Sequence, residues 1–346
     1  MVKEWNLLRV FASLSVVLLH STTQISRIVG HPQYDIYYFF RIILNYATPT
    51  FIVLSIIILA NRYPNRLPDN FWAGRIKYIY LPFVSFGILD AFVRLHFNPN
   101  LKLDQKILDN ILTGKFEGWF ILVIFQLYIL HYLVVRFKLS MVWMLPLSLI
   151  VMALYLSFIT GEVPPMNGLE YTLKLPFFAW FGYFTAAFLI GKHYKYLSEK
   201  LLKYRWFTLF MLVVSLGIVY LGHRAGISEI SSRRLDLYPL VLSVTAVFLA
   251  WGQLIPQSKI INIISNYSFG IYLLHWQVQR FMAPYVAEYV TYYIPQVIVL
   301  LIGSTVVSMI IIKLVSMLPF GEFIVGKTKR KKAKAAPKEK AIAELA

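Results

Sequence analysis

The stretch Arg9-Val-Phe-Ala-Ser-Leu-Ser-Val-Val-Leu-Leu-His20 lies inside the first long apolar segment of the chain, residues 5–25. In a helix, eleven steps of about 100° return to within roughly 20° of the starting direction and rise about 16 Å. Arg9 and His20 therefore share one stripe of the helix at two different depths. Ionisable side chains inside a bilayer are costly, so this pair indicates a functional site facing a protein interior or a water-filled cavity.

Apolar segments of similar length recur along the whole chain of 346 residues, which is 58% hydrophobic and 14% charged. A soluble protein carries about 25% charged residues, so the composition is typical of a membrane protein. We predict an all-α, polytopic membrane protein, a bundle of about ten helices in one domain over residues 1–320. The predicted spans are residues 6–26, 36–60, 77–97, 118–136, 140–160, 172–191, 206–223, 237–255, 263–284 and 293–318.

The net charge of +18 comes from short clusters between the apolar segments and from the end of the chain. No folded basic domain carries it, which argues against a nucleic-acid partner. Cytoplasmic loops accumulate Lys and Arg, and the clusters fit one orientation, with both termini cytoplasmic in a multi-pass cell-membrane protein. We expect residues 321–346 to form a basic, disordered cytoplasmic tail that is attracted to the lipid bilayer. The chain has no Cys, and its His spacing predicts no metal site.

Four short motifs follow one another along the chain in register with these spans. They are Arg9-x10-His20, Phe51-Ile-Val-Leu54-Ser55, Arg75-Ile-Lys77-Tyr78-Ile-Tyr80-Leu-Pro82 and Ser268-Phe-Gly-Ile-Tyr272-Leu-Leu-His275. With them the chain resembles the acyltransferase-3 family of integral membrane acyltransferases, most closely the intercellular-adhesion C branch found in staphylococcal biofilm loci. The chain departs from the family pattern where Ile56-Ile57 replace Gly-Phe and where Tyr78 replaces an Arg.

Acyl transfer to a hydroxyl needs a base for its proton and a positive group where negative charge develops. Neutral imidazole, with a pKa of about 6.5, suits the first task, so we predict that His20 is the catalytic base, working with Arg9. Arg9, Arg75 and Lys77 lie toward the cytoplasmic end, where guanidinium groups match the phosphates of an acyl-CoA. Arg75 and Lys77 are accordingly the predicted donor-binding residues. Positive-inside charge and snorkelling to headgroups are the plainer explanations for these cations.

Three further residues are expected on the acceptor side, at the outer end of the bundle. His275 lies well inside the ninth span and shares its face with Tyr272. It either orients His20, lines the acceptor end of the cavity, or makes a structural hydrogen bond between helices. Glu117 either assists an acceptor hydroxyl or simply precedes Trp119, a typical interfacial anchor.

The resemblance implies an O-acyltransferase that moves an acetyl or succinyl group from a cytosolic acyl-CoA onto a cell-surface glycan such as an exopolysaccharide. Acetyl-CoA or succinyl-CoA would be a co-substrate, with no permanently bound cofactor, and polysaccharide synthase machinery is a candidate partner. The main alternative is a polysaccharide exporter or flippase. A third possibility is a scaffold within a synthase complex, which would tolerate replacement of His20 and Arg9.

Overall fold

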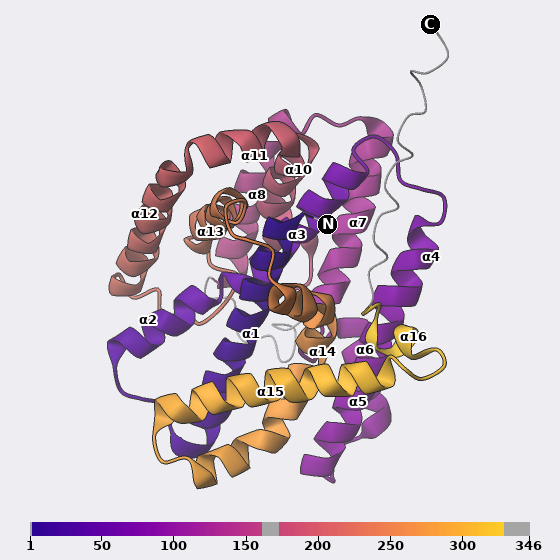
Figure 1. Ribbon diagram of the computed structural model, residues 1–346, viewed down its shortest axis with the longest axis vertical. Helices are drawn as coiled ribbons and strands as arrows, with labels where there is room; N and C mark the ends of the chain where they lie inside the picture. Colours follow the sequence, from indigo (N-terminus) through magenta and orange to yellow (C-terminus); the bar gives the residue numbers. More distant parts are fainter. Residues whose placement is uncertain (1, 161–172, 329–346) are drawn as a thin grey trace, which may run out of the picture.

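A computed structural model describes residues 2–160 and 173–328, and within these ranges every regular element is a helix. Figure 1 shows the arrangement. The elements are α1 Lys3–Val29, α2 Asp35–Leu44, α3 Ala47–Arg62, α4 Phe71–Arg75, the π-helix η1 Ile76–Tyr80, α5 Leu81–Phe97, α6 Leu103–Thr113, α7 Phe120–Phe137, α8 Met141–Thr160, the 3-10 helix η2 Phe177–Trp180, α10 Phe181–Lys192, α11 Tyr194–Lys203, α12 Arg205–Arg224, α13 Leu237–Trp251, α14 Lys259–Tyr289, α15 Tyr293–Val315 and α16 Gly321–Val325.

The predicted membrane spans fall on these helices. In the described ranges, seven segments are long and apolar enough to cross a membrane: Lys3–Val29, Asp35–Arg62, Phe71–Phe97, Phe120–Phe137, Met141–Ile159, Arg205–Arg224 and Tyr293–Val315. Two shorter apolar helices, Phe177–Lys192 and Leu237–Trp251, account for two more predicted spans. The remaining one is α14, which has 31 residues. The prediction of an all-helical, multi-pass membrane protein is confirmed.

Local structure departs from the predicted spans in two places. The second span is two helices, α2 and α3, because Asn45 ends α2 and its side chain donates to the Arg41 carbonyl at 2.8 Å. The third span begins earlier than predicted, at Phe71, and passes through the π-helix η1.

The predicted tail also differs at its start. Residues Gly321–Val325 form α16, which packs against η1 with Phe323 and Tyr78 ring centroids 5.6 Å apart. The apolar side chains of these first residues are enough to fold them onto the bundle. Residues 329–346 of the predicted tail lie outside the described residues.

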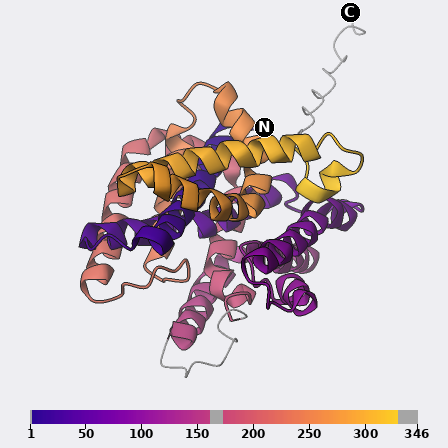
Figure 2. The same cartoon turned by 90° about the horizontal axis from the view of Figure 1, so that it is seen from below.

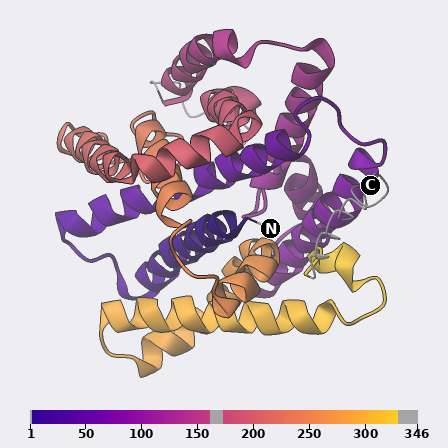
Figure 3. The ribbon, with the colours of Figure 1, turned by 45° about the horizontal axis from the view of Figure 1, so that its top comes forward.

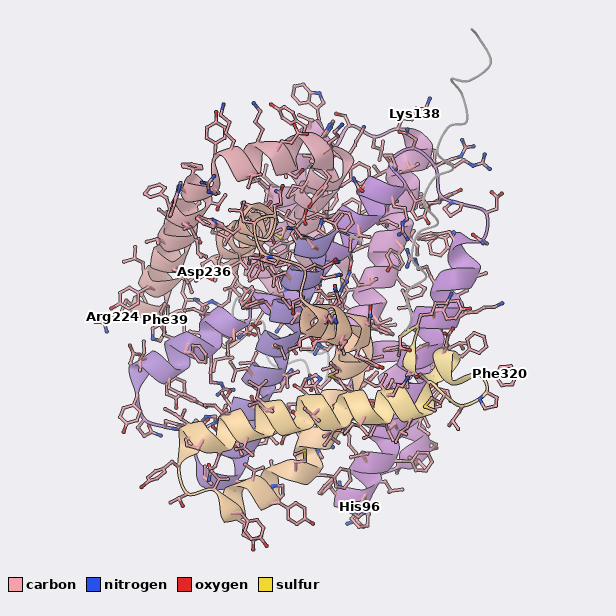
Figure 4. All side chains as sticks on the ribbon, viewed as in Figure 1. Phe39, His96, Lys138, Arg224, Asp236 and Phe320 are labelled. Atoms are coloured by element: carbon pink, nitrogen blue, oxygen red, sulfur yellow. The ribbon has the colours of Figure 1, made fainter. Side chains whose placement is uncertain are left out.

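Helix α1 occupies the centre of the bundle. It packs against α14 and α15 on one side and α3 on the other, and α13 also contacts it. Figure 3 shows α1 lying between α2–α3 and α15, and Figure 2 shows α15 and α8 on opposite sides of the molecule. Lys138, predicted to be cytoplasmic, and His96, predicted to be outside, lie at opposite ends in Figure 4. We call the end near His96 the outer end.

Polar side chains fix the register of α1 against α14. Toward the outer end, Gln279 donates to the Val17 carbonyl at 3.0 Å and to the Ser21 hydroxyl at 2.8 Å. Toward the other end, Asn6 donates to the Asn262 side chain at 2.9 Å. Hydrogen bonds of this kind hold helices together where apolar burial favours no single partner. Because they act at two levels, they set the depth at which side chains of α1 and α14 meet.

Candidate active site

Two histidines from distant parts of the sequence meet between α1 and α14. The ring centroids of His20 and His275 lie 5.2 Å apart, with their planes inclined at 34°. Trp276 also meets His20, with its ring edge-on and the centroids 4.8 Å apart. His275 is completely buried. The structure therefore places His275 beside His20, as a role in orienting His20 requires.

The surroundings of His275 fix which of its ring nitrogens carries the proton. Nδ1 lies 2.9 Å from the carbonyl oxygen of Ile271, one turn earlier on α14. A carbonyl only accepts, so Nδ1 donates, and in the neutral ring Nε2 carries the lone pair. This Nε2 is buried and has no hydrogen-bond partner among the described residues. His275 thus offers a nitrogen lone pair inside the protein, next to His20.

Glu117 completes the group from the segment that enters α7. Its Oε2 lies 3.6 Å from His20 Nε2, and the side chains of His20 and Glu117 are 21% and 18% exposed. The separation is longer than a strong hydrogen bond, but it suits a carboxylate facing an imidazole that becomes charged. Tyr272 holds the position of Glu117 by donating its hydroxyl to the Glu117 main-chain carbonyl at 2.5 Å. Both facing side chains are therefore partly exposed.

Arg9 lies on the same stripe of α1, about 16 Å along the helix from His20. Its guanidinium donates to Asn6 Oδ1 at 3.2 Å and to Ser265 Oγ at 3.0 Å, so it contacts α14 as His20 does. The stripe predicted from the eleven-residue spacing is therefore confirmed as one face of α1, and that face packs on α14.

Arg75 and Lys77 have other surroundings. The Arg75 guanidinium stacks over the rings of Phe71 and Tyr128, with its Cζ 4.8 and 4.9 Å from their centroids. Lys77 is exposed on η1. Their donor-binding role remains a prediction.

Sequence reasoning missed a buried polar cluster beside the site. Asp90 on α5 is completely buried, and its carboxylate accepts from Gln277 Nε2 at 2.6 Å. It also accepts from Arg94 Nε at 3.0 Å, one turn later on the same helix. Gln277 follows Trp276 directly, so the cluster anchors the part of α14 that contacts His20. A buried acid within a span was the available signal, but its partner on α14 was not apparent from the sequence.

The described residues contain no group of three or more His, Asp or Glu side chains placed to hold a metal ion. The available chemistry is that of imidazole, carboxylate and guanidinium groups. Such a set can move a proton from a hydroxyl and balance the resulting charge.

The chain is similar to known proteins over most of its length. The acyltransferase-3 family model, described as an acyltransferase domain, matches residues 2–313. The chain belongs to this family. It is 35% identical over 291 residues to the "Putative membrane-bound acyltransferase YfiQ" of Bacillus subtilis (strain 168), covering 79% of this chain and 80% of that protein. This member of the acyltransferase-3 family is therefore an acyltransferase of the cell membrane.

More distant relatives carry a different name. The chain is 22% identical over 282 residues to the "Probable poly-beta-1,6-N-acetyl-D-glucosamine export protein" of Staphylococcus aureus (strain MSSA476), covering 78% of this chain and 79% of that protein. It is 24% identical over 283 residues to the protein of the same name from Staphylococcus epidermidis, covering 78% of each. No solved structure matches the chain. The predicted resemblance to the acyltransferase-3 family is confirmed, and the staphylococcal proteins are among the relatives of the chain.

Proposed function

We propose that this acyltransferase moves an acetyl or succinyl group from a cytosolic acyl-CoA to a hydroxyl of a cell-surface glycan. One observation carries the proposal: His20 faces the Glu117 carboxylate at 3.6 Å and packs against His275, with the His20 and Glu117 side chains partly exposed. The group lies toward the outer end of α1. Arg9 lies about 16 Å away on the same helix, toward the end where a cytosolic donor would enter.

The proposed reaction needs one base and one charge partner. His20 takes the proton of the acceptor hydroxyl while that oxygen bonds to the thioester carbonyl carbon. The nearby Glu117 carboxylate stabilises the imidazolium that forms. When the tetrahedral intermediate collapses, the carbon–sulfur bond breaks and the CoA thiolate takes the proton back from His20. His275 packs against the His20 ring and acts as a positioning residue.

A surface glycan is the acceptor that these observations favour. Glu117 precedes α7 at its predicted outer end, so the proposed base and its partner are reached from outside the cell. The name of the staphylococcal relatives refers to a surface polysaccharide, and such a polymer offers many hydroxyls. The same name also gives the second candidate function, export of a polysaccharide.

The test compares surface polysaccharide from cells that carry wild-type protein, the His20→Ala variant or no protein, at matched protein levels. His193→Ala is the control, because His193 is exposed between α10 and α11, away from the site. Esters that appear only with wild type and the control, at constant polymer yield, support the proposal. Unchanged esters together with a polymer yield that follows the protein would support export instead. Esters that persist in His20→Ala would exclude His20 as the base.

A further inference from the structure

We infer that the acceptor carries negative charge, as phosphate or carboxylate groups, and that an outer arginine cluster holds it beside His20. The cluster consists of Arg27 on α1, Arg94 on α5 and Arg280 on α14. This inference rests on the proposed function and adds the chemical class of its acceptor. It follows from how closely these cations lie to one another and to the proposed base.

A direct chain of contacts joins Arg27 to the proposed base. Its guanidinium lies over the ring of Trp276, with Cζ 5.0 Å from the centroid. The same Trp276 ring meets His20 edge-on, with centroids 4.8 Å apart. Arg27 is exposed and Trp276 is buried, so the pair connects the outer surface to the reaction site. An anion held by Arg27 would lie one side chain away from His20.

Arg280 brings a second cation to the same place. It follows Trp276 by one turn of α14, is half-buried, and lies over the Phe97 ring with Cζ 5.8 Å from the centroid. It is close enough to Arg27 and Arg94 for their charges to repel it. Stacking on an aromatic ring offsets little of this repulsion.

Among the described residues, negative charge near the cluster is scarce and already engaged. Asp90 and Glu117 are the carboxylates in electrostatic range of Arg280. Asp90 already accepts from Arg94 at 3.0 Å, and Glu117 faces His20. Within residues 2–160 and 173–328, neither Arg27 nor Arg280 forms an ion pair with a carboxylate. The site therefore has spare positive charge at its outer end.

A fourth guanidinium gives independent support from another helix. Arg41 on α2 is 6% exposed and donates to Thr23 Oγ1 at 2.9 Å. Its Nε is buried without a hydrogen-bond partner in the described part of the chain. With Arg27, it lies within electrostatic range of His20. Burying such a cation is costly unless an anion is bound nearby, and the guanidinium fork matches phosphate and carboxylate oxygens.

The experiment uses the full-length protein in nanodiscs of phosphatidylcholine, which supply no anionic lipid. Surface glycans from cells that lack the protein are separated by anion exchange into neutral and anionic fractions, and each is offered with radiolabelled acetyl-CoA and, separately, with radiolabelled succinyl-CoA. We expect label in the anionic fraction. Arg27→Gln and Arg280→Gln should each raise the acceptor KM about tenfold, since each removes a charge-assisted contact. Arg280→Lys should recover part of this loss.

The matched control is Arg224→Gln. Arg224 is an exposed arginine at the predicted outer end of α12, and in Figure 4 it lies well apart from His96, which is on the same helix as Arg94. Its KM should equal that of wild type. Equal labelling of the neutral fraction, or an unchanged KM in Arg27→Gln and Arg280→Gln, would overturn the inference and leave the proposed function standing.

Two other outcomes also count against it. If these variants alter only the response to added phosphatidylglycerol, the arginines bind lipid headgroups and not the acceptor. If wild-type protein labels neither fraction, the proposed function fails and the inference fails with it.

Discussion

Replacing Asp90 with alanine should strongly destabilise the fold. Asp90 is completely buried and accepts hydrogen bonds from Arg94 and Asn110 at 3.0 and 2.9 Å. It also accepts from Gln277 at 2.6 Å, and Lys106 Nζ lies 3.7 Å away. The substitution would leave two cations without their buried carboxylate and the Gln277 amide without this acceptor, and Asn110 would keep only the Gly87 carbonyl as an acceptor for its amide.

The expected size follows from these contacts. Removing one partner of a buried ion pair costs about 3–5 kcal/mol, because an uncompensated charge stays buried. For a chain of this size that corresponds to a melting temperature lower by roughly 4–7 °C. Replacing all three charged residues with apolar ones, as Asp90→Leu, Arg94→Leu and Lys106→Met together, should recover most of the loss, because no buried charge then remains.

The assay is thermal melting of the detergent-solubilised protein, followed by size-exclusion chromatography. Asp69→Ala is the control, since Asp69 pairs with Arg66 while their side chains are 94% and 82% exposed. Exposed pairs contribute little, so this variant should melt within about 1 °C of wild type. If Asp90→Ala behaves like Asp69→Ala, the carboxylate does not hold α5 and α14 together and the reasoning is wrong.

Three more predictions concern single positions. Gly191→Ala should lower the melting temperature, because the new Cβ would lie 2.5 Å from a backbone oxygen of α3. The control is Gly217→Ala, whose Cβ would meet nothing within 4 Å, so this variant should be neutral or stabilising. Equal effects of the two substitutions would contradict close packing of α10 on α3. Tyr272→Phe should lower kcat about tenfold, since Glu117 loses the hydrogen bond that positions it, and an unchanged kcat would show that this bond is not needed. Burial, followed by repulsion from a nearby guanidinium, lowers the pKa of Lys106 from 10.5 to about 8. The unfolded state therefore binds more protons between these values, so stability should rise with pH there. A melting series should show that rise in wild type and lose it in Lys106→Met.

The arrangement of spans was predictable because apolar length is a local property of the sequence. The break between α2 and α3 was not predicted, although Pro49 in the first turn of α3 gave a signal. Proline is tolerated in the first turn of a helix, where a backbone N–H needs no hydrogen-bond partner. That position is typical of a helix start, and the continuous apolar composition of residues 36–60 obscured it.

The candidate site was predictable only in part. The motif spacing brought His20 and His275 to attention, and the structure places them in contact. Trp276 was missed, because the sequence of α14 does not distinguish an aromatic side chain that packs on a neighbouring helix from one that faces lipid. The stacking of Arg75 on Tyr128 depends on a helix that starts forty-five residues later. Local sequence patterns identify reactive side chains, but the partners of these side chains depend on contacts between helices that lie far apart in the sequence.

The central place of α1 has a consequence for biosynthesis. This helix leaves the ribosome first, yet the helices that cover its polar stripe, α14 and α15, are synthesised last. Arg9 and His20 must enter the membrane long before Ser265 and His275 exist to receive them. The proposed site therefore cannot form during most of the insertion. A chain truncated upstream of α14 should insert into the membrane with only the α1 half of the proposed site. Its first helix would then be a target for quality-control proteases.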